Sequence, residues 1–265
     1  MEKQYWNAIW ISDVHLGTRD CKASSLLSFL KNNRCRQLYL VGDIIDGWRI
    51  STSKWFWPSE HNKVLRQLLR KAEKEHTKIF YIPGNHDEFL KEYLHDHQLQ
   101  MGNIHVRKEM EHTCATGQKL WIVHGDLFDG VTRHHRLVLL LGDIGYGLLI
   151  RLNIWLNRAR HLLKMPYWSL SASIKLRLKS ASSYITDFEQ SVAHEAKRRG
   201  YDGVICGHIH HANQRFIEGI GYYNCGDWVD SCTALAEDKD GGIHIIRWNR
   251  EDTAESNVIP LKLSA

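Results

Sequence analysis

Five short segments of the sequence each place histidine, aspartate or asparagine directly after an apolar stretch. They read SDVHLG (12–17), GDIID (42–46), GNHDEF (84–89), HGDLFD (124–129) and GHIHH (207–211). Neutral imidazoles and carboxylates are ligands that first-row transition metals bind well. Taken singly, any one of these segments is more often a helix cap, a turn or a solvated polar group. Their repetition after successive apolar stretches predicts a metal centre.

The five segments contain seven candidate ligands, which are Asp13, His15, Asp43, Asn85, His124, His208 and His210. Residues i and i+2 of an extended segment point the same way, so Asp13 with His15, and His208 with His210, are expected to approach one centre together. The set is larger than one ion needs, which predicts two ions that share a carboxylate. Glycine beside the ligands, as at Gly207, permits tight turns and close backbone approach.

The elements that must carry these segments follow from the hydrophobic pattern of the first half of the chain. Strand-like and helical stretches alternate there, with strands over 6–11, 37–41 and 78–82 and helices over 23–32 and 61–76. This alternation is typical of an α/β protein. Functional groups of such sheets gather past the carboxyl ends of the strands, so the five segments are expected to meet at one edge.

The second half of the chain changes character twice. A further strand over 119–123 is followed by a helical region, 127–199, that is rich in Leu, Arg and Trp, and then by short strands separated by glycines. The late strands are expected over 203–206, 214–219, 219–226 and 241–248. The predicted organisation is therefore a core of residues 1–126 and 200–265, interrupted by a helical cap over 127–199.

The overall composition limits the possible classes of protein. The 265 residues are 43% hydrophobic, enough to bury a core, and the net charge of +5 suits an anionic partner without requiring one. The six cysteines form no C-x-x-C pair and the first residues lack a secretory pattern, which predicts reduced thiols in a cytoplasmic protein. The apolar stretch 137–156 contains Asp143, Arg151 and Asn153, so a transmembrane helix is not expected.

The five segments resemble the five motif blocks of the calcineurin-like metallophosphoesterases. The matching residues are Asp13-x-His15, Gly42-Asp43-x-x-Asp46, Gly84-Asn85-His86-Asp87, Val123-His124-Gly125-Asp126 and Gly207-His208-x-His210. The resemblance implies a four-layer α/β/β/α sandwich with two divalent metal ions, most often Mn and otherwise Fe or Zn. It further implies that a metal-activated water attacks phosphorus, so that no protein nucleophile is needed.

By the same resemblance, each predicted residue receives a role. One ion would be held by Asp13, His15, Asp43 and His210, and the other by Asp43, Asn85, His124 and His208, with Asp43 as the bridge. His86 would stabilise charge on the phosphoryl group or protonate the leaving oxygen. Asp87 and Asp126 would fix imidazole tautomers. His211 is expected at the surface or in contact with substrate.

Other features indicate which phosphoester is cleaved. The second block with Trp48, the insertion, and the ending YYNCGDWVDSCTAL resemble the UDP-2,3-diacylglucosamine hydrolases of lipid A synthesis. That resemblance implies cleavage of a pyrophosphate to UMP and a lipid phosphate. However, His86 stands where that group typically has Arg. The substitution favours a paralogue acting on another lipid-linked or nucleotide diphosphate, or on a phosphodiester.

The helical insertion leaves two interpretations open. Residues 133–164 mix apolar side chains with Arg and His, so they could cover an acyl-chain groove and meet anionic headgroups of the inner membrane. Alternatively, their leucines pack on the core and their arginines are solvated. The oligomeric state is left open.

Two functions of other classes are also considered. A nuclease could stack bases on the ten tryptophans, but these do not alternate with Lys or Arg, so nucleic acid is not the expected partner. A non-catalytic scaffold would be marked by lost ligands, and all seven are present.

Overall fold

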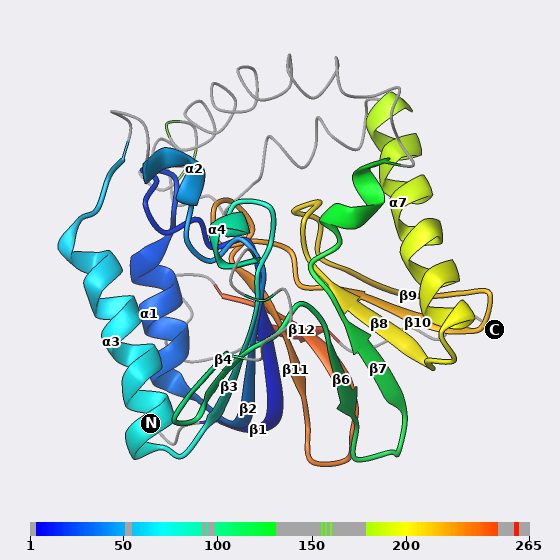
Figure 1. Cartoon of the computed structure of the whole chain (residues 1–265), viewed down its shortest axis with the longest axis horizontal. Coiled ribbons are helices and arrows are strands. Elements are labelled where there is room, and N and C mark those ends of the chain that lie inside the picture. The colour runs from blue at the N-terminus through cyan, green and yellow to red at the C-terminus, as the bar shows by residue number, and fades with distance from the viewer. Residues whose placement is uncertain are drawn as a thin grey trace. The chain divides into compact units, whose positions relative to one another are not determined.

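The computed structural model describes residues 4–50, 55–91, 94, 99–130, 155, 157, 160, 179–248 and 257–259. Within them the strands form two sheets, drawn in Figure 1. The larger sheet has the strand order β13-β12-β11-β1-β2-β3-β5-β4. Its strands are β1 (Gln4–Ile11), β2 (Asn33–Val41), β3 (Lys78–Ile82), β4 (Leu99–Met101), β5 (Ile104–Val106), β11 (Thr233–Glu237), β12 (Ile243–Arg247) and β13 (Asn257–Ile259).

The smaller sheet has the strand order β6-β7-β8-β10-β9. Its strands are β6 (Met110–Thr113), β7 (Lys119–Ile122), β8 (Gly203–Cys206), β9 (Asn213–Ile217) and β10 (Ile220–Asn224). Parallel pairing joins β1, β2, β3 and β5 in the larger sheet and β7, β8 and β10 in the smaller one. The remaining neighbours pair antiparallel.

Helices α1 (Ala23–Asn32) and α3 (Ser59–Lys74) lie beside one face of the larger sheet (Figure 1). The other helical elements are α2 (Gly47–Ile50), α4 (Glu88–Lys91), a 3₁₀ helix at Asp126–Gly130, and α7 (Lys179–Arg198). Just after α7, the guanidinium of Arg199 lies 4.5 Å from the ring centroid of Trp121 in β7, so the end of this helix is tied to the smaller sheet.

The two faces of the larger sheet bury different side chains, because successive residues of a strand point to opposite sides. In β1, Ile9 and Ile11 pack in one core with Phe29 of α1. Ala8 and Trp10 pack in a second core with residues of the smaller sheet, such as Ile122. A strand buried on both faces has an almost continuous apolar sequence, as QLYLV in β2 does. The predicted α/β sandwich is confirmed.

The chain divides into two compact units, Met1–Asp126 with Ala193–Ala265, and Leu127–Val192. In the second unit, the Tyr184 hydroxyl donates to Asp129 Oδ1 at 3.1 Å, and Phe128 meets Phe188 with ring centroids 6.4 Å apart. Most of the predicted cap, including nearly all of 133–164, lies outside the described residues. The boundaries 1–126, 127–199 and 200–265 therefore stay a prediction. None of the helices described is both long and apolar enough to cross a membrane.

Candidate metal centre

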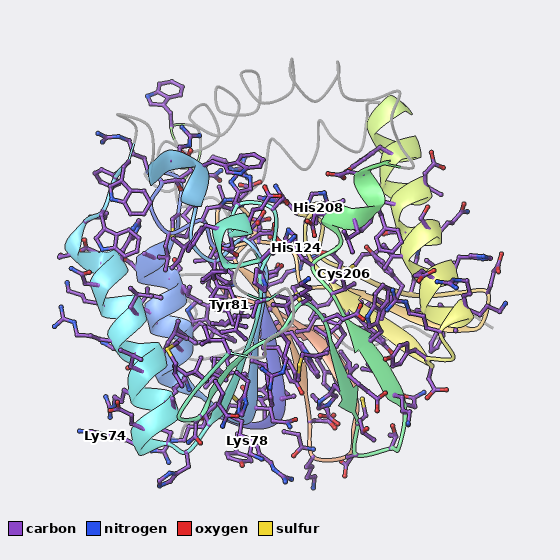
Figure 2. All side chains as sticks on the ribbon, in the orientation of Figure 1. Lys74, Lys78, Tyr81, His124, Cys206 and His208 are labelled. Atoms are coloured by element: carbon purple, nitrogen blue, oxygen red, sulfur yellow. The ribbon has the colours of Figure 1, made fainter. Side chains whose placement is uncertain are left out.

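The predicted site residues follow the strands as the sequence indicated. Asp13 and His15 come after β1, Asp43 after β2, and Asn85 to Asp87 after β3. His124 comes after β7, and His208 and His210 after β8. Figure 2 shows His124 and His208 at one end of the strands, whereas Lys74 and Lys78 lie at the opposite end. The polar segments thus collect at the carboxyl ends of the parallel strands.

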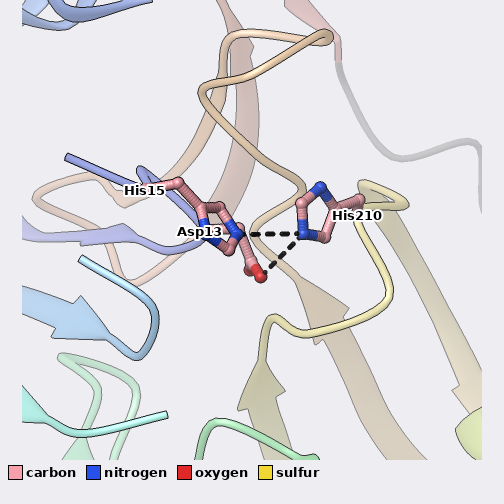
Figure 3. Close-up of side chains that lie close together, drawn as sticks. All are labelled: Asp13, His15 and His210. Atoms are coloured by element: carbon pink, nitrogen blue, oxygen red, sulfur yellow. Dashed lines mark hydrogen bonds and ion pairs between the residues drawn. The ribbon is translucent and has the colours of Figure 1, made fainter. Parts of the chain in front are cut away.

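Four groups of side chains among the described residues could hold a metal ion, and two of them contain six of the seven predicted ligands. Asp13, His15 and His210 form the first of these two clusters (Figure 3). The Nε2 atom of His210 lies 3.1 Å from Oδ1 of Asp13 and 3.4 Å from Nε2 of His15. One possible ligand atom from each residue lies within 4.8 Å of the other two. A single cation placed among them could therefore be reached by all three side chains.

Asp43, His124 and His208 form the second cluster. His124 Nε2 faces Asp43 Oδ2 at 3.3 Å, and the rings of His124 and His208 meet edge to face with centroids 5.1 Å apart. The other nitrogen of His124, Nδ1, donates to the carbonyl oxygen of Val41 at 2.9 Å. Since a carbonyl can only accept, this bond keeps a proton on Nδ1 and aims Nε2 at the cluster.

Asp43 connects the two clusters. Its Oδ2 atom, which faces His124, is also 4.0 Å from Nε2 of His15. Its Oδ1 atom accepts the backbone N–H of His86 at 2.8 Å, which fixes the carboxylate in place. Only 2% of Asp43 is exposed, so its charge must be offset by neighbours or by a cation.

The donor set fits a divalent metal ion. Imidazole nitrogens, carboxylates and an amide oxygen are ligands for Mn, Fe and Zn. Asn85 Oδ1 is buried and accepts no hydrogen bond within the part of the chain that the structure describes. Buried polar atoms of this kind ordinarily have a partner, and a cation would satisfy this one.

Without a metal, the carboxylates hold the histidines in their charged form. Burial disfavours charge on His124, but the charge and hydrogen bond of Asp43, with the charge of Asp13, raise its pKa to about 10. Burial acts in the same way on His15, and the hydrogen bond of Asp46 with the charge of Asp43 raises its pKa to about 9. The site therefore favours positive charge at its centre.

The carboxylates respond in the opposite direction. Burial alone would raise the pKa of Asp13, but the charge and hydrogen bond of His210 lower it to about 2. The pKa of Asp43 is also lowered, against the effect of burial, by the charge and hydrogen bond of His124 and by the charge of His15. Both carboxylates are thus ionised at neutral pH, as metal ligands must be.

The backbone at the site is not the extended strand that the sequence analysis assumed. Asp13, His15, Asp43, His208 and His210 all have positive φ, between 50° and 70°. Strand alternation is therefore the wrong reason, since β1 and β8 end before these residues, although Asp13 and His15 do share one cluster as predicted. As a consequence, the histidines at 208 and 210 belong to different clusters. Left-handed backbone at non-glycine residues costs energy, and such residues cluster at active sites and ligand clamps.

Two positions beside the candidate ligands must be glycine because there is no space for a side chain. A Cβ at Gly207 would lie 2.5 Å from Oδ2 of Asp13, and one at Gly84 would overlap Oδ1 of Asp43. Neither glycine has a positive φ, so the close approach alone excludes a side chain.

Asp46 is a site residue to which the sequence analysis gave no role. Its Oδ2 atom lies 3.5 Å from Nδ1 of His15 and 3.2 Å from Nδ1 of His86, and the residue is buried. One carboxylate therefore orients a candidate ligand and the candidate acid together. The signal was present as the second aspartate of GDIID, four residues into the segment that follows β2.

His86 lies between two aromatic rings. Trp48 covers it with ring centroids 3.9 Å apart, and His15 meets it edge to face at 4.6 Å. It forms a further cluster with His15 and Asp43. The imidazole is thus held at the border of the two clusters.

Asp87 and Asp126 have described partners other than imidazoles. The carboxylate of Asp87 accepts the backbone N–H groups of Ile44 at 3.0 Å and Ile45 at 2.8 Å, so it ties the loop after β3 to the loop after β2. Asp126 pairs with Lys91 Nζ at 2.5 Å. Their predicted part in catalysis stays a prediction. His211 is in none of the clusters found among the described residues.

Comparison with known proteins defines the class to which this site belongs. The sequence model of the calcineurin-like phosphoesterases matches residues 8–212, which include every candidate ligand. The chain belongs to the calcineurin-like phosphoesterase family and is a metallophosphoesterase, a hydrolase that acts on phosphoester bonds. No curated protein matches the sequence at a significant level.

Several solved structures are similar to this chain at low identity. Vacuolar protein sorting 29 from Cryptosporidium parvum is 11% identical, with 95% of this chain and 94% of that chain covered and a TM-score of 0.43. A novel archaeal phosphodiesterase is 14% identical, with 91% and 98% covered and a TM-score of 0.41. The phosphoesterase YfcE from E. coli is 15% identical, with 91% and 99% covered and a TM-score of 0.39.

Proposed function

We propose that the chain is a binuclear phosphoesterase that cleaves a pyrophosphate or phosphodiester bond in a lipid-linked nucleotide such as UDP-2,3-diacylglucosamine. The observation that carries the binuclear part is the position of Asp43. Its Oδ2 atom faces His124 of one cluster at 3.3 Å and His15 of the other at 4.0 Å. Asp43 would therefore be able to contribute to both sets of residues that hold the ions.

In this proposal two sets of residues hold the ions, with Mn as the first choice and Fe or Zn as alternatives. The first set is Asp13, His15, Asp43 and His210, and the second is Asp43, Asn85, His124 and His208. When bound, divalent ions supply a water of lowered pKa and positive charge for the phosphoryl oxygens. The lowered pKa values of Asp13 and Asp43 support ionised ligands at neutral pH.

His86 is the proposed proton donor to the leaving oxygen. Its Nδ1 atom is engaged by Asp46 at 3.2 Å, which leaves Nε2 to face the substrate. Trp48 restricts the rotation of the ring by covering one face of it. In this scheme Asp46 keeps the acid in one orientation, and Asp87 keeps the loop that carries it against the loop after β2.

The identity of the substrate rests on sequence resemblance, and His86 favours a second candidate. Because the lipid A hydrolases typically have Arg at this position, a paralogue that cleaves another nucleotide or lipid phosphate is the alternative function. Cytoplasmic location and contact of residues 133–164 with the inner membrane belong to the first candidate. Co-flotation of the protein with anionic liposomes at low salt tests that contact, and recovery wholly in the soluble fraction would exclude it.

One comparison of substrates separates the two candidates. Mn-loaded protein is assayed on UDP-2,3-diacylglucosamine and on bis-p-nitrophenyl phosphate, with Asp43→Ala as the inactive control. Release of UMP by the wild type but not by the variant supports the lipid nucleotide as substrate. Hydrolysis of the artificial diester alone supports the alternative. Equal rates for the wild type and Asp43→Ala on both compounds would contradict a reaction at this site.

A further inference from the structure

The loop that carries His15 is fastened on two sides. On one side it pairs with the loop after β2, where the N–H groups of Val14 and His15 both donate to the carbonyl oxygen of Asp43 at 2.9 Å. On the other side it meets residues 55–61, which precede and begin α3. The second attachment is formed at Gly17, two residues beyond the candidate ligand.

Three contacts converge on Gly17. Its N–H donates to Nδ1 of His61 at 3.2 Å, and its carbonyl oxygen accepts the N–H of Phe56 at 3.0 Å. The indole of Trp55 lies so close to its Cα that a Cβ would overlap the ring. With φ of +108°, the position is also one that only glycine adopts readily. Gly17 is therefore held at its N–H, at its carbonyl oxygen and by the ring that packs against its Cα.

The surroundings of His61 favour a neutral imidazole that can accept a hydrogen bond. It lies in the first turn of α3 and is 2% exposed. The rings of Trp57 and Phe56 meet its imidazole edge to face, at 90° and 88°. Burial lowers the pKa of His61, although Glu60 opposes the shift. A neutral imidazole with an unprotonated Nδ1 is the form that accepts the N–H of Gly17.

We propose that His61 is a positioning residue, which holds the His15 loop in its metal-binding conformation by accepting the hydrogen bond of the Gly17 N–H. The inference rests on the proposed metal site and adds to it a residue 46 positions away in the chain. His61 acts through Gly17 and touches neither ion nor substrate. Partners that hydrogen-bond a ligand side chain directly typically contribute 10- to 100-fold to metal affinity or activity, and His61 acts one step further from the ligand.

Two substitutions at position 61 separate the hydrogen bond from the packing. In His61→Asn, the side-chain oxygen replaces Nδ1 and keeps an acceptor near Gly17. In His61→Phe, the ring still packs against Trp57 and Phe56 but no acceptor remains. We expect His61→Phe to lose about tenfold or more in affinity for Mn(II), measured by calorimetric titration of the metal-free protein, and His61→Asn to stay within about threefold of the wild type.

A second readout reports on the bond itself. Hydrogen exchange of the Gly17 amide, followed by NMR, should accelerate at least tenfold in His61→Phe and much less in His61→Asn. The melting temperature of each variant is measured as well, to show that it is folded. Should His61→Phe fail to fold, Trp55→Ala tests the same attachment from the surface side, because Trp55 is 36% exposed. It is expected to accelerate exchange at Gly17 and weaken Mn(II) binding in the same direction.

The outcomes distinguish this inference from the proposed function. The inference is supported if His61→Phe loses Mn(II) affinity and protection of the Gly17 amide while His61→Asn retains both, even if no phosphoester is hydrolysed. Wild-type values of Mn(II) affinity and Gly17 exchange in both His61 variants would overturn the inference. Equal losses of Mn(II) affinity in both variants would also overturn it, since the hydrogen-bond acceptor would then be irrelevant. If turnover is present, kcat is expected to fall in His61→Phe while KM stays within about twofold.

Discussion

The carboxylate of Asp46 lies 3.2 Å from Nδ1 of His86, and the same oxygen atom lies 3.5 Å from Nδ1 of His15. A single buried aspartate thus sets the orientation of a candidate metal ligand and of the candidate acid. Because both rings present their Nδ1 atoms to Asp46, both Nε2 atoms are directed elsewhere.

Asp46→Asn should weaken both metal binding and catalysis. The amide keeps the size of the side chain but loses the charge that faces His15 and His86, so we expect the affinity for Mn(II) and kcat each to fall by about 10- to 100-fold. Metal analysis and steady-state kinetics of the purified variant check this. Glu195→Gln, which alters an exposed ion pair with Arg198, is the control, and its metal binding and kcat should match those of the wild type. A wild-type kcat in Asp46→Asn would show that the contact with His86 is dispensable.

The metal-free protein should become less stable as the pH rises. The pKa values of His15 and His124 are raised to about 9 and about 10, above the ordinary value of 6.5. Their ion pairs therefore stabilise the folded state fully below about pH 6.5, and this stabilisation is lost as the pH rises through 9 and 10. Chemical denaturation at pH 7 and pH 10 measures the change.

The matching control for this pH effect is Asp43→Asn, which lacks the principal charge facing His124. It should lose less stability than the wild type between the two pH values. Binding of Mn(II) at pH 7 should also release protons, because the imidazoles must lose them to become ligands. Identical calorimetric enthalpies in buffers of different ionisation enthalpy would contradict this expectation.

Gly207→Ala should inactivate the site without unfolding the protein. The added methyl group would lie 2.5 Å from Oδ2 of Asp13 and from the hydroxyl of Ser12, so it must displace a candidate ligand. Gly102→Ala is the comparison, because it introduces a side chain at φ of +57° with no atom within 4 Å. We expect at least a 100-fold loss of activity in Gly207→Ala and none in Gly102→Ala. Comparable activity in the two variants would argue against a tight fit at Asp13.

A buried polar bridge between the two sheets should contribute to stability away from the site. The Nε2 atom of His112 in β6 lies 2.9 Å from Oε2 of Glu237 in β11, and the Tyr39 hydroxyl lies 3.0 Å from Nδ1 of the same imidazole. Glu237→Leu leaves one nitrogen of the buried His112 ring without this partner, which should cost about 1–3 kcal/mol. The double variant Glu237→Leu/His112→Phe should recover part of that loss, as measured by denaturant unfolding.

Much of this architecture could be predicted because the signals were local. The helix over 23–32 and the strand over 78–82 have the predicted bounds, and an apolar strand precedes the candidate ligands at all five segments. Strand β11, with the sequence TALAE, was missed. Its residues have low strand propensity, and they form a strand because β1 and β12 bury them from both sides.

The residues of the candidate site were proposed from the sequence, but their supporting contacts could not be. The left-handed backbone at His208 and His210 sends their side chains to different clusters, which no alternation rule could have indicated. The contact of His61 with Gly17 joins residues 44 apart in the chain, and only the tertiary fold brings them together. Side chains that act through others carry no local sequence signal of their own.

The most direct test of the central claim is whether two Mn(II) ions bind per chain and share Asp43. The metal-free protein is titrated with Mn(II), the stoichiometry is measured by calorimetry, and magnetic coupling between the ions is followed by electron paramagnetic resonance. The account predicts two ions per chain with a coupled signal, which is lost in Asp43→Asn together with phosphoester hydrolysis. A single uncoupled ion in the active wild type, or full hydrolysis by Asp43→Asn, would contradict it.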